Sequence, residues 1–214
     1  MTRKRELLGQ TPDELNQALK AHFQNRGEPG YRADQVAEWL FDKLAPDFEA
    51  MTNLPLVERE ALAGAFTITD PETATVSRSA DGTVKHLWTL SDGELVESVL
   101  IPADERLTLC ISSQAGCGMG CTFCATGYGG LRRNLTAAEI VGQYRASQRW
   151  AEEEGLGRIG NVVFMGMGEP LANRRALFPA LTLLNHGYGV GARRITVSTV
   201  GVAPGIRELA ERSE

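Results

Sequence analysis

The segment RLTLCISSQAGCGMGCTFCATG, residues 106–127, says more about the fold and chemistry of this 214-residue chain than any other stretch. Its first half is apolar and β-branched, which predicts a strand from Leu107 to Ser112. Its second half holds Cys117, Cys121 and Cys124 in the spacing C-x3-C-x2-C, among glycines and other small residues. Three thiolates are one fewer than a closed zinc site or an ordinary iron–sulfur cluster uses. A 4Fe–4S cluster held by these three cysteines would therefore keep one iron open.

Other uses of the cysteines are less consistent with the sequence. All four, including Cys110, lie in one short stretch that no signal peptide precedes, so we expect a reducing, cytoplasmic location rather than disulfides. A zinc site is the main alternative, with Cys110 as its fourth ligand. Cys110, however, lies in the predicted strand seven residues before Cys117, which is a poor position for completing a tight turn. The cluster is the favoured interpretation; zinc and unrelated buried thiols stay as alternatives.

The composition is that of an ordinary globular protein. Hydrophobic residues make up 43% and charged residues 23% of the chain. No apolar run approaches the roughly 18 residues of a membrane span, so we expect no membrane association. The net charge is −5, which gives no general attraction to nucleic acid. Local basic clusters such as Arg132-Arg133 are more often solvated faces than RNA sites.

Residues 1–67 are predicted to form a helical accessory domain. The capping box at Thr11–Glu14 starts a helix at Pro12, which Asn25-Arg26-Gly27 ends. A second helix is expected from about Ala33 to Leu44. A third follows Pro55, with three side chains pointing inward: Val57, Leu62 and Ala65.

Residues 68–105 are predicted to form a small antiparallel β extension. Residues 76–79 and 83–90 alternate in polarity around Asp81-Gly82, a strong hairpin signal. Asp92-Gly93 repeats that signal before residues 95–101. The result is a three-stranded meander closed by Pro102.

Residues 106–214 alternate strand and helix. Strands are expected at 107–112, 161–165 and 194–199, and helices at about 136–153, 175–185 and from Pro204 onward. This order predicts an α/β fold with three right-handed parallel βα units, a partial barrel whose last strand leaves an open edge.

Three candidate elements follow those strands, and sites in parallel α/β folds lie at the carboxyl ends of strands. They are the cysteine loop, the turn Gly166-Met-Gly-Glu-Pro170 and Ser198-Thr199. Gly166 and Gly168 would allow close approach to a ligand, and Glu169 could pair with an ammonium group. A Gly-Glu-Pro turn by itself is more often a plain loop, but its place after a buried strand beside the cysteine motif favours a binding role.

The cysteine spacing resembles that of the radical S-adenosylmethionine (SAM) superfamily. Longer segments resemble the RlmN family of RNA adenine methyltransferases over nearly the whole chain: Tyr31–Trp39, Met51-Thr52, Glu97-Ser-Val99, Cys110–Cys117 and Gly166–Leu171. The resemblance implies a 4Fe–4S cluster on Cys117, Cys121 and Cys124. It also implies SAM contacts by Gly168, Glu169 and Ser198.

The same resemblance implies a reaction and partners. RlmN enzymes methylate carbon 2 of an adenine in 23S rRNA, many also act on tRNA, and an electron donor such as flavodoxin serves them. The methyl group travels by way of a cysteine in the family's C-terminal tail. Glu97 matches the proposed general base, and Cys110 matches the cysteine that resolves the protein–RNA adduct by forming a disulfide. The alternatives are a Cfr-like carbon 8 methyltransferase and a non-catalytic iron–sulfur or zinc module that contacts RNA.

One departure from the family is large. No cysteine follows Cys124, and the sequence ends at Glu214, after the third predicted βα unit. The methyl-accepting cysteine is therefore missing. We expect the chain to be the amino-terminal portion of a longer protein, and to be inactive without the rest.

Overall fold

The computed structural model describes residues 4–103 and 106–212. Its first part contains α1 (Pro12–Asn25), α2 (Arg32–Phe41) and α3 (Leu56–Ala65), with the short parallel strands β1 (Arg5–Glu6) and β2 (Phe66–Thr67) beside them. The predicted capping box of α1 is confirmed, because the Thr11 side chain accepts a hydrogen bond from the Glu14 N–H and the Glu14 carboxylate accepts one from the Thr11 N–H. The predicted bounds of this helix are confirmed as well.

Two details of the helical region differ from expectation. Helix α2 ends at Phe41 instead of Leu44, because Leu44 has a left-handed φ of 51°, which no α-helix can include. In α3, Leu62 is buried as predicted, but Val57 is 63% exposed and Ala65 is also exposed. Glu58 points inward in their place and binds Arg26 at 2.9 Å. An ion pair to the end of α1 therefore fixes the rotation of α3.

The β extension forms as predicted and continues into the core. Strands β3 (Glu72–Arg78), β4 (Val84–Thr89) and β5 (Leu95–Ala103) are antiparallel, with left-handed glycines in both hairpin turns. β5 extends one residue past Pro102 and pairs antiparallel with β6 (Arg106–Cys110). The meander and the parallel strands thus belong to one six-stranded sheet, ordered β10-β9-β6-β5-β4-β3.

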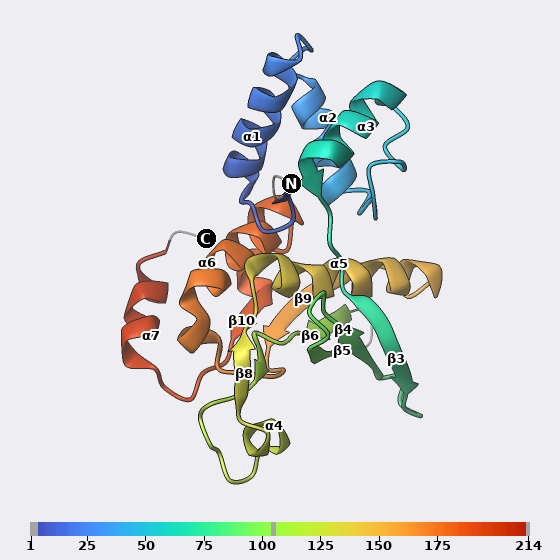
Figure 1. Cartoon of the computed structure of the whole chain (residues 1–214). Coiled ribbons are helices and arrows are strands. Elements are labelled where there is room, and N and C mark those ends of the chain that lie inside the picture. Colours follow the sequence, from blue (N-terminus) through green and yellow to red (C-terminus); the bar gives the residue numbers. More distant parts are fainter. Residues whose placement is uncertain (1–3, 104–105, 213–214) are drawn as a thin grey trace.

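The predicted parallel βα units are present. β6, β9 (Ile159–Phe164) and β10 (Ile195–Val197) run parallel, and β10 is an edge strand. The helices are α5 (Ala137–Glu153), α6 (Arg174–Thr182), which passes into a π-helical turn (Leu183–Gly187), and α7 (Ala203–Ala210) (Figure 1). Smaller elements were not predicted: β7 (Gln114–Gly116), α4 (Ala125–Tyr128), β8 (Leu131–Asn134), and 3₁₀ turns at Pro170–Asn173 and Ala192–Arg194. The mixed α/β fold is confirmed.

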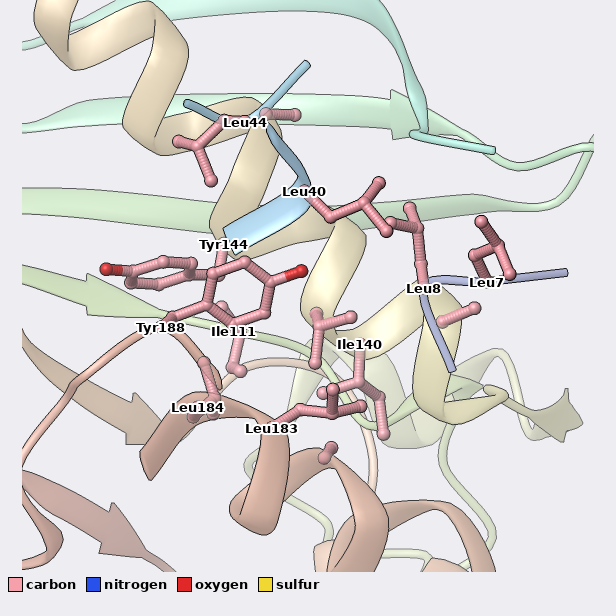
Figure 2. Close-up of a cluster of buried hydrophobic side chains, with 14 of the residues drawn as sticks. Leu7, Leu8, Leu40, Leu44, Ile111, Ile140, Tyr144, Leu183, Leu184 and Tyr188 are labelled. Carbon is pink, nitrogen blue, oxygen red and sulfur yellow. The ribbon is translucent and has the colours of Figure 1, made fainter. Parts of the chain in front are cut away.

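One face of the sheet is covered and the other is open. On the covered face, Trp88 and Ser98 are buried, and Ser98 reaches Ser147 of α5 at 3.4 Å. Figure 2 shows Leu40, Tyr144 and Leu183 within one cluster of buried side chains, so the helical region, α5 and the π-helical turn share one apolar core. The open face carries half-buried or exposed side chains on five strands, among them Lys85, Glu97, Cys110, Asn161 and Thr196. No helix in the described part of the chain is long and apolar enough to cross a membrane.

Candidate functional site

The cysteine loop is closed at its base by a small antiparallel ladder. β7 pairs with β8, with Gln114 opposite Asn134, and the Cys117 N–H donates to the Gly130 carbonyl at 3.0 Å. Gly116 has a φ of 77°, and a Cβ at this position would lie 2.0 Å from the Gly130 oxygen. Only glycine therefore allows the two sides of this stem to meet so closely.

The three predicted ligands lie together on this loop. Cys117, Cys121 and Cys124 are free thiols and all are half-buried. The Cys124 N–H donates to the Cys121 carbonyl at 3.1 Å, and Cys124 immediately precedes α4. The backbone N–H of Gly127 lowers the pKa of the Cys124 thiol, and the thiolate is the form that binds metal.

The fit of an iron–sulfur cluster rests on this donor set. Iron–sulfur clusters are held by cysteine thiolates, and three of them on one glycine-rich loop would hold such a cluster with one iron left open. In residues 4–103 and 106–212, no three Cys, His, Asp or Glu side chains form a group that could hold a metal ion. The three thiols of the loop therefore do not point toward a common metal position. The residue types and the loop therefore match the cluster, whereas the thiol positions shown here are not those of a ligand set.

Cys110 lies apart from the loop, at the end of β6. It is half-buried on the open face, opposite Val99 of β5 and Val163 of β9, and burial raises the pKa of its thiol. A strand position between two neighbours gives Cys110 no freedom to reach into the cysteine loop. The described residues contain no four-cysteine group of the kind a zinc site needs.

Glu97 and Cys110 share the open face. Glu97 lies two residues before Val99 on β5, and Val99 is the cross-strand partner of Cys110, so both side chains leave the sheet on the same side. Lys85 of β4 contacts the Glu97 carboxylate at 2.9 Å, and both side chains are partly exposed. The structure thus places the two predicted catalytic side chains on adjacent strands.

The turn after β9 packs tightly onto the stem of the cysteine loop. A Cβ on Gly166 would lie 2.7 Å from the Ile111 carbonyl oxygen, and one on Gly168, whose φ is 99°, would lie 2.5 Å from the Cβ of Gln114. In this structure the two glycines therefore allow the turn to pack closely against residues 111–114 of the same chain.

Glu169 joins two of the predicted site elements. Its side chain is buried; one carboxylate oxygen accepts from the Leu171 N–H at 2.9 Å and the other from the Val200 N–H at 2.8 Å. Val200 is two residues beyond Ser198, which is exposed just after β10. A carboxylate has about four acceptor positions, so two are left for another donor.

Buried amide side chains hold these elements together, and the sequence analysis missed them. Gln114 bonds to Asn134 and to the Glu169 N–H, while Asn173 donates to the carbonyls of Ser113 and Leu135. Gln143 of α5 bonds to both backbone groups of Ser112. The signal in the sequence was the polar triplet Ser112-Ser-Gln114 directly after an apolar strand.

Comparison with known proteins agrees with this arrangement. Residues 7–68 match the sequence model of the ribosomal RNA large subunit methyltransferase N-terminal domain, and residues 111–213 match that of the radical SAM superfamily. A protein of Gemmatimonas aurantiaca named "Probable dual-specificity RNA methyltransferase RlmN" is 49% identical over 100% of this chain and 59% of its own length. The "Dual-specificity RNA methyltransferase RlmN" of Nitratidesulfovibrio vulgaris is 46% identical over 96% of this chain and 58% of its own.

A solved structure has the same fold. The crystal structure of a radical SAM methyltransferase from Sphaerobacter thermophilus superposes with a TM-score of 0.89 and 43% identity, over 97% of this chain and 60% of that one. This chain thus spans less than two thirds of the relatives that it matches. The two matched domains, their order along the chain and relatives that match it from end to end make it a member of the RlmN family within the radical SAM superfamily.

Proposed function

We propose that this chain supplies the cluster site and part of the SAM site of a methyltransferase acting on carbon 2 of adenine in 23S rRNA and tRNA. The observation that carries the proposal is the name shared by the relatives, dual-specificity RNA methyltransferase. The site geometry supports it, since Glu169 links the turn after β9 to the segment after β10 beside the stem of the cysteine loop.

Each predicted residue has a role in this proposal. Cys117, Cys121 and Cys124 would hold the 4Fe–4S cluster, which together with SAM supplies one-electron chemistry when bound. Glu169 would accept a hydrogen bond from the SAM amino group, with Gly168 and Ser198 lining the same contact: Glu169 and Gly168 belong to the turn after β9, and Ser198 follows β10.

The open face would carry the proton and thiol chemistry. Glu97 would take up a proton from the adenine; its carboxylate lies 2.9 Å from the ammonium group of Lys85. Cys110, on the adjacent strand, would be the thiol that resolves the protein–RNA adduct.

The remaining assignments follow the family. We divide the chain into a helical accessory domain (1–67), a β extension (68–105) and a radical SAM core (106–214). The partners would be rRNA, tRNA and an electron donor such as flavodoxin, and the site of action the cytoplasm.

The test is a chimera in which this chain replaces the matching segment of the Gemmatimonas aurantiaca relative. The chimera is expressed in cells that lack their own enzyme, and rRNA and tRNA are digested for mass spectrometry. We expect 2-methyladenosine from the chimera, and none from a Cys121→Ala chimera. Formation of 8-methyladenosine instead would support the Cfr-like alternative, and no methylated adenine at all would contradict the proposal.

A second measurement tests which cysteines bind the cluster. After anaerobic reconstitution of the chimera, we expect each Cys→Ala change at 117, 121 or 124 to abolish bound iron and the associated visible absorbance. Cys110→Ala is the matched control and should keep both. Iron lost in the Cys110 variant would show that this thiol is a ligand and that the three-cysteine assignment is wrong.

A further inference from the structure

Gln114 is a buried amide at the junction of two loops. Its side chain belongs to β7, three residues before Cys117, and the residue is only 2% exposed. The side-chain oxygen accepts from the Glu169 N–H at 2.8 Å, and the side-chain nitrogen donates to the Asn134 side chain at 2.7 Å. The backbone N–H of Gln114 donates to the Met167 carbonyl at 3.2 Å.

These bonds connect three segments that are far apart in the sequence. Asn134 lies on β8, which returns from the cysteine loop, whereas Glu169 and Met167 belong to the turn after β9. The Cβ of Gln114 also faces Gly168, whose missing side chain leaves just enough room for it. One side chain therefore contacts both sides of the cysteine-loop stem and the backbone of the turn that carries Glu169.

We propose that Gln114 is a positioning residue that holds the Gly166–Pro170 turn in register with the base of the cysteine loop. Its effect on SAM binding rests on the proposed function, whereas its effect on the turn does not. Gln114 binds the backbone N–H of Glu169 and does not touch the Glu169 carboxylate. By fixing the backbone of Glu169, it determines the point from which the Glu169 side chain extends.

The substitution Gln114→Met removes both side-chain hydrogen bonds while nearly conserving volume and burial. Gln148→Met is the matched control. Gln148 of α5 is also buried; its side-chain oxygen accepts from the Ile159 N–H and its side-chain nitrogen donates to Glu152 and to the Gly157 carbonyl. None of these bonds reaches the Gly166–Pro170 turn. Both variants should lose comparable stability, and only the first should release the turn.

Hydrogen exchange on the unligated chain tests the positioning. We expect Gln114→Met to speed the exchange of the Glu169 amide by about tenfold, the effect of losing one buried hydrogen bond, and Gln148→Met to leave it nearly unchanged. Equal protection in wild type and Gln114→Met, or equal loss in both variants, would overturn the proposal. If Gln114→Met does not fold, Gln114→Asn keeps the amide but is one methylene too short to reach both partners, and the same outcomes apply.

SAM affinity tests the consequence for the site. In the reconstituted chimera, we expect Gln114→Met to raise the Kd for SAM by about tenfold with unchanged iron content, and Gln148→Met to leave both as they are. The SAM-dependent change in the electron paramagnetic resonance spectrum of the reduced cluster should weaken in parallel. Unchanged SAM affinity in the Gln114 variant would refute the effect on the site. If the unaltered chimera binds no SAM, the proposed function fails, and the hydrogen exchange alone decides on Gln114.

Discussion

At the scale of single residues, His86 shows how burial sets a proton equilibrium. Its ring stacks on Trp88 at 4.7 Å and meets Trp150 edge-on at the same centroid distance. Neither ring nitrogen has a hydrogen-bond partner among the described residues. Burial, with a smaller contribution from the charge of Arg78, lowers the pKa of His86 from 6.5 to about 4. The folded protein therefore keeps this imidazole neutral at pH values at which the unfolded chain protonates it.

The lowered pKa predicts a loss of stability in mild acid. Unfolded His86 takes up a proton below about pH 6.5, whereas folded His86 does so only near pH 4. The contribution is thus fully present above pH 6.5 and is lost as the pH falls toward 4. At pH 5 the free energy of unfolding should have dropped by about 2 kcal/mol from this group.

The variant His86→Phe keeps an aromatic ring between the two tryptophans and removes the titration. Urea unfolding at pH 7 and pH 5 should show a smaller decrease for this variant than for wild type. His186→Gln, at an exposed histidine, is the control and should retain the wild-type decrease. If His86→Phe loses as much stability as wild type between these pH values, other groups cause the acid sensitivity.

Gly168 combines two constraints that a control can separate. Its φ is 99°, and a Cβ would lie 2.5 Å from that of Gln114; Gly93 has a similar φ of 88° but nothing within 4 Å of such a Cβ. Gly93→Ala should cost about 1–2 kcal/mol from backbone strain alone. Gly168→Ala should cost about 1–3 kcal/mol more from overpacking. Equal losses in urea unfolding would mean that Gln114 moves aside freely.

At the scale of secondary-structure elements, the start of α5 connects three parts of the site region. The Thr136 side chain accepts from the Glu139 N–H at 3.2 Å, and the Glu139 carboxylate accepts from the Thr136 N–H at 2.8 Å. Arg133 of β8 binds the same carboxylate through two nitrogens and also contacts Asp92 in the turn before β5. The helix cap thereby fixes one end of the cysteine-loop stem.

Removing this cap should destabilise the protein by a predictable amount. Thr136→Ala leaves the Glu139 N–H without its acceptor, which typically costs about 1 kcal/mol. Thr52→Ala, at an exposed position outside any helix, should change the urea midpoint little. A midpoint for Thr136→Ala equal to that of the control would show that water satisfies the helix end equally well.

At the scale of the whole molecule, Arg145 fastens the helical region to the core. This arginine of α5 is completely buried; it donates to the carbonyls of Leu40 and Ala45 and binds the Asp70 carboxylate at 2.8 Å. Arg149, one turn later, binds the other oxygen of Asp70. The helical region packs over α5 at this point, as Figure 1 shows, and Leu40 and Leu44 lie close to Tyr144 in Figure 2.

Arg145→Met should therefore loosen the helical region. It leaves two buried carbonyls without a donor and Asp70 with one arginine, and loss of one partner in a buried ion pair costs about 3–5 kcal/mol. Hydrogen exchange in residues 40–45 should accelerate. Arg149→Met removes a partly exposed partner and should have a clearly smaller effect. Similar exchange rates in the two variants would contradict a special role for the buried arginine.

The sequence by itself determined the parts of this protein that depend on neighbours a few residues away. The capping boxes at Thr11 and Thr136 and the Asp-Gly turns of the meander were predicted correctly, because each signal acts within about one turn of the chain. The place of the cysteine loop and of Glu169 also followed, since parallel strands present their carboxyl ends at one edge of a sheet.

Tertiary structure decided the rest, because it depends on contacts between distant segments. Gln114 meets Asn134 and Glu169 across separations of 20 and 55 residues, and Arg145 meets Leu40 across 105. Three further features depend on contacts that no local sequence pattern predicts: the inward orientation of Glu58, the pairing of β5 with β6, and the β7–β8 stem. A buried amide or guanidinium is stable only where the fold supplies its hydrogen bonds, so these residues acquire their roles only after the chain has folded around them.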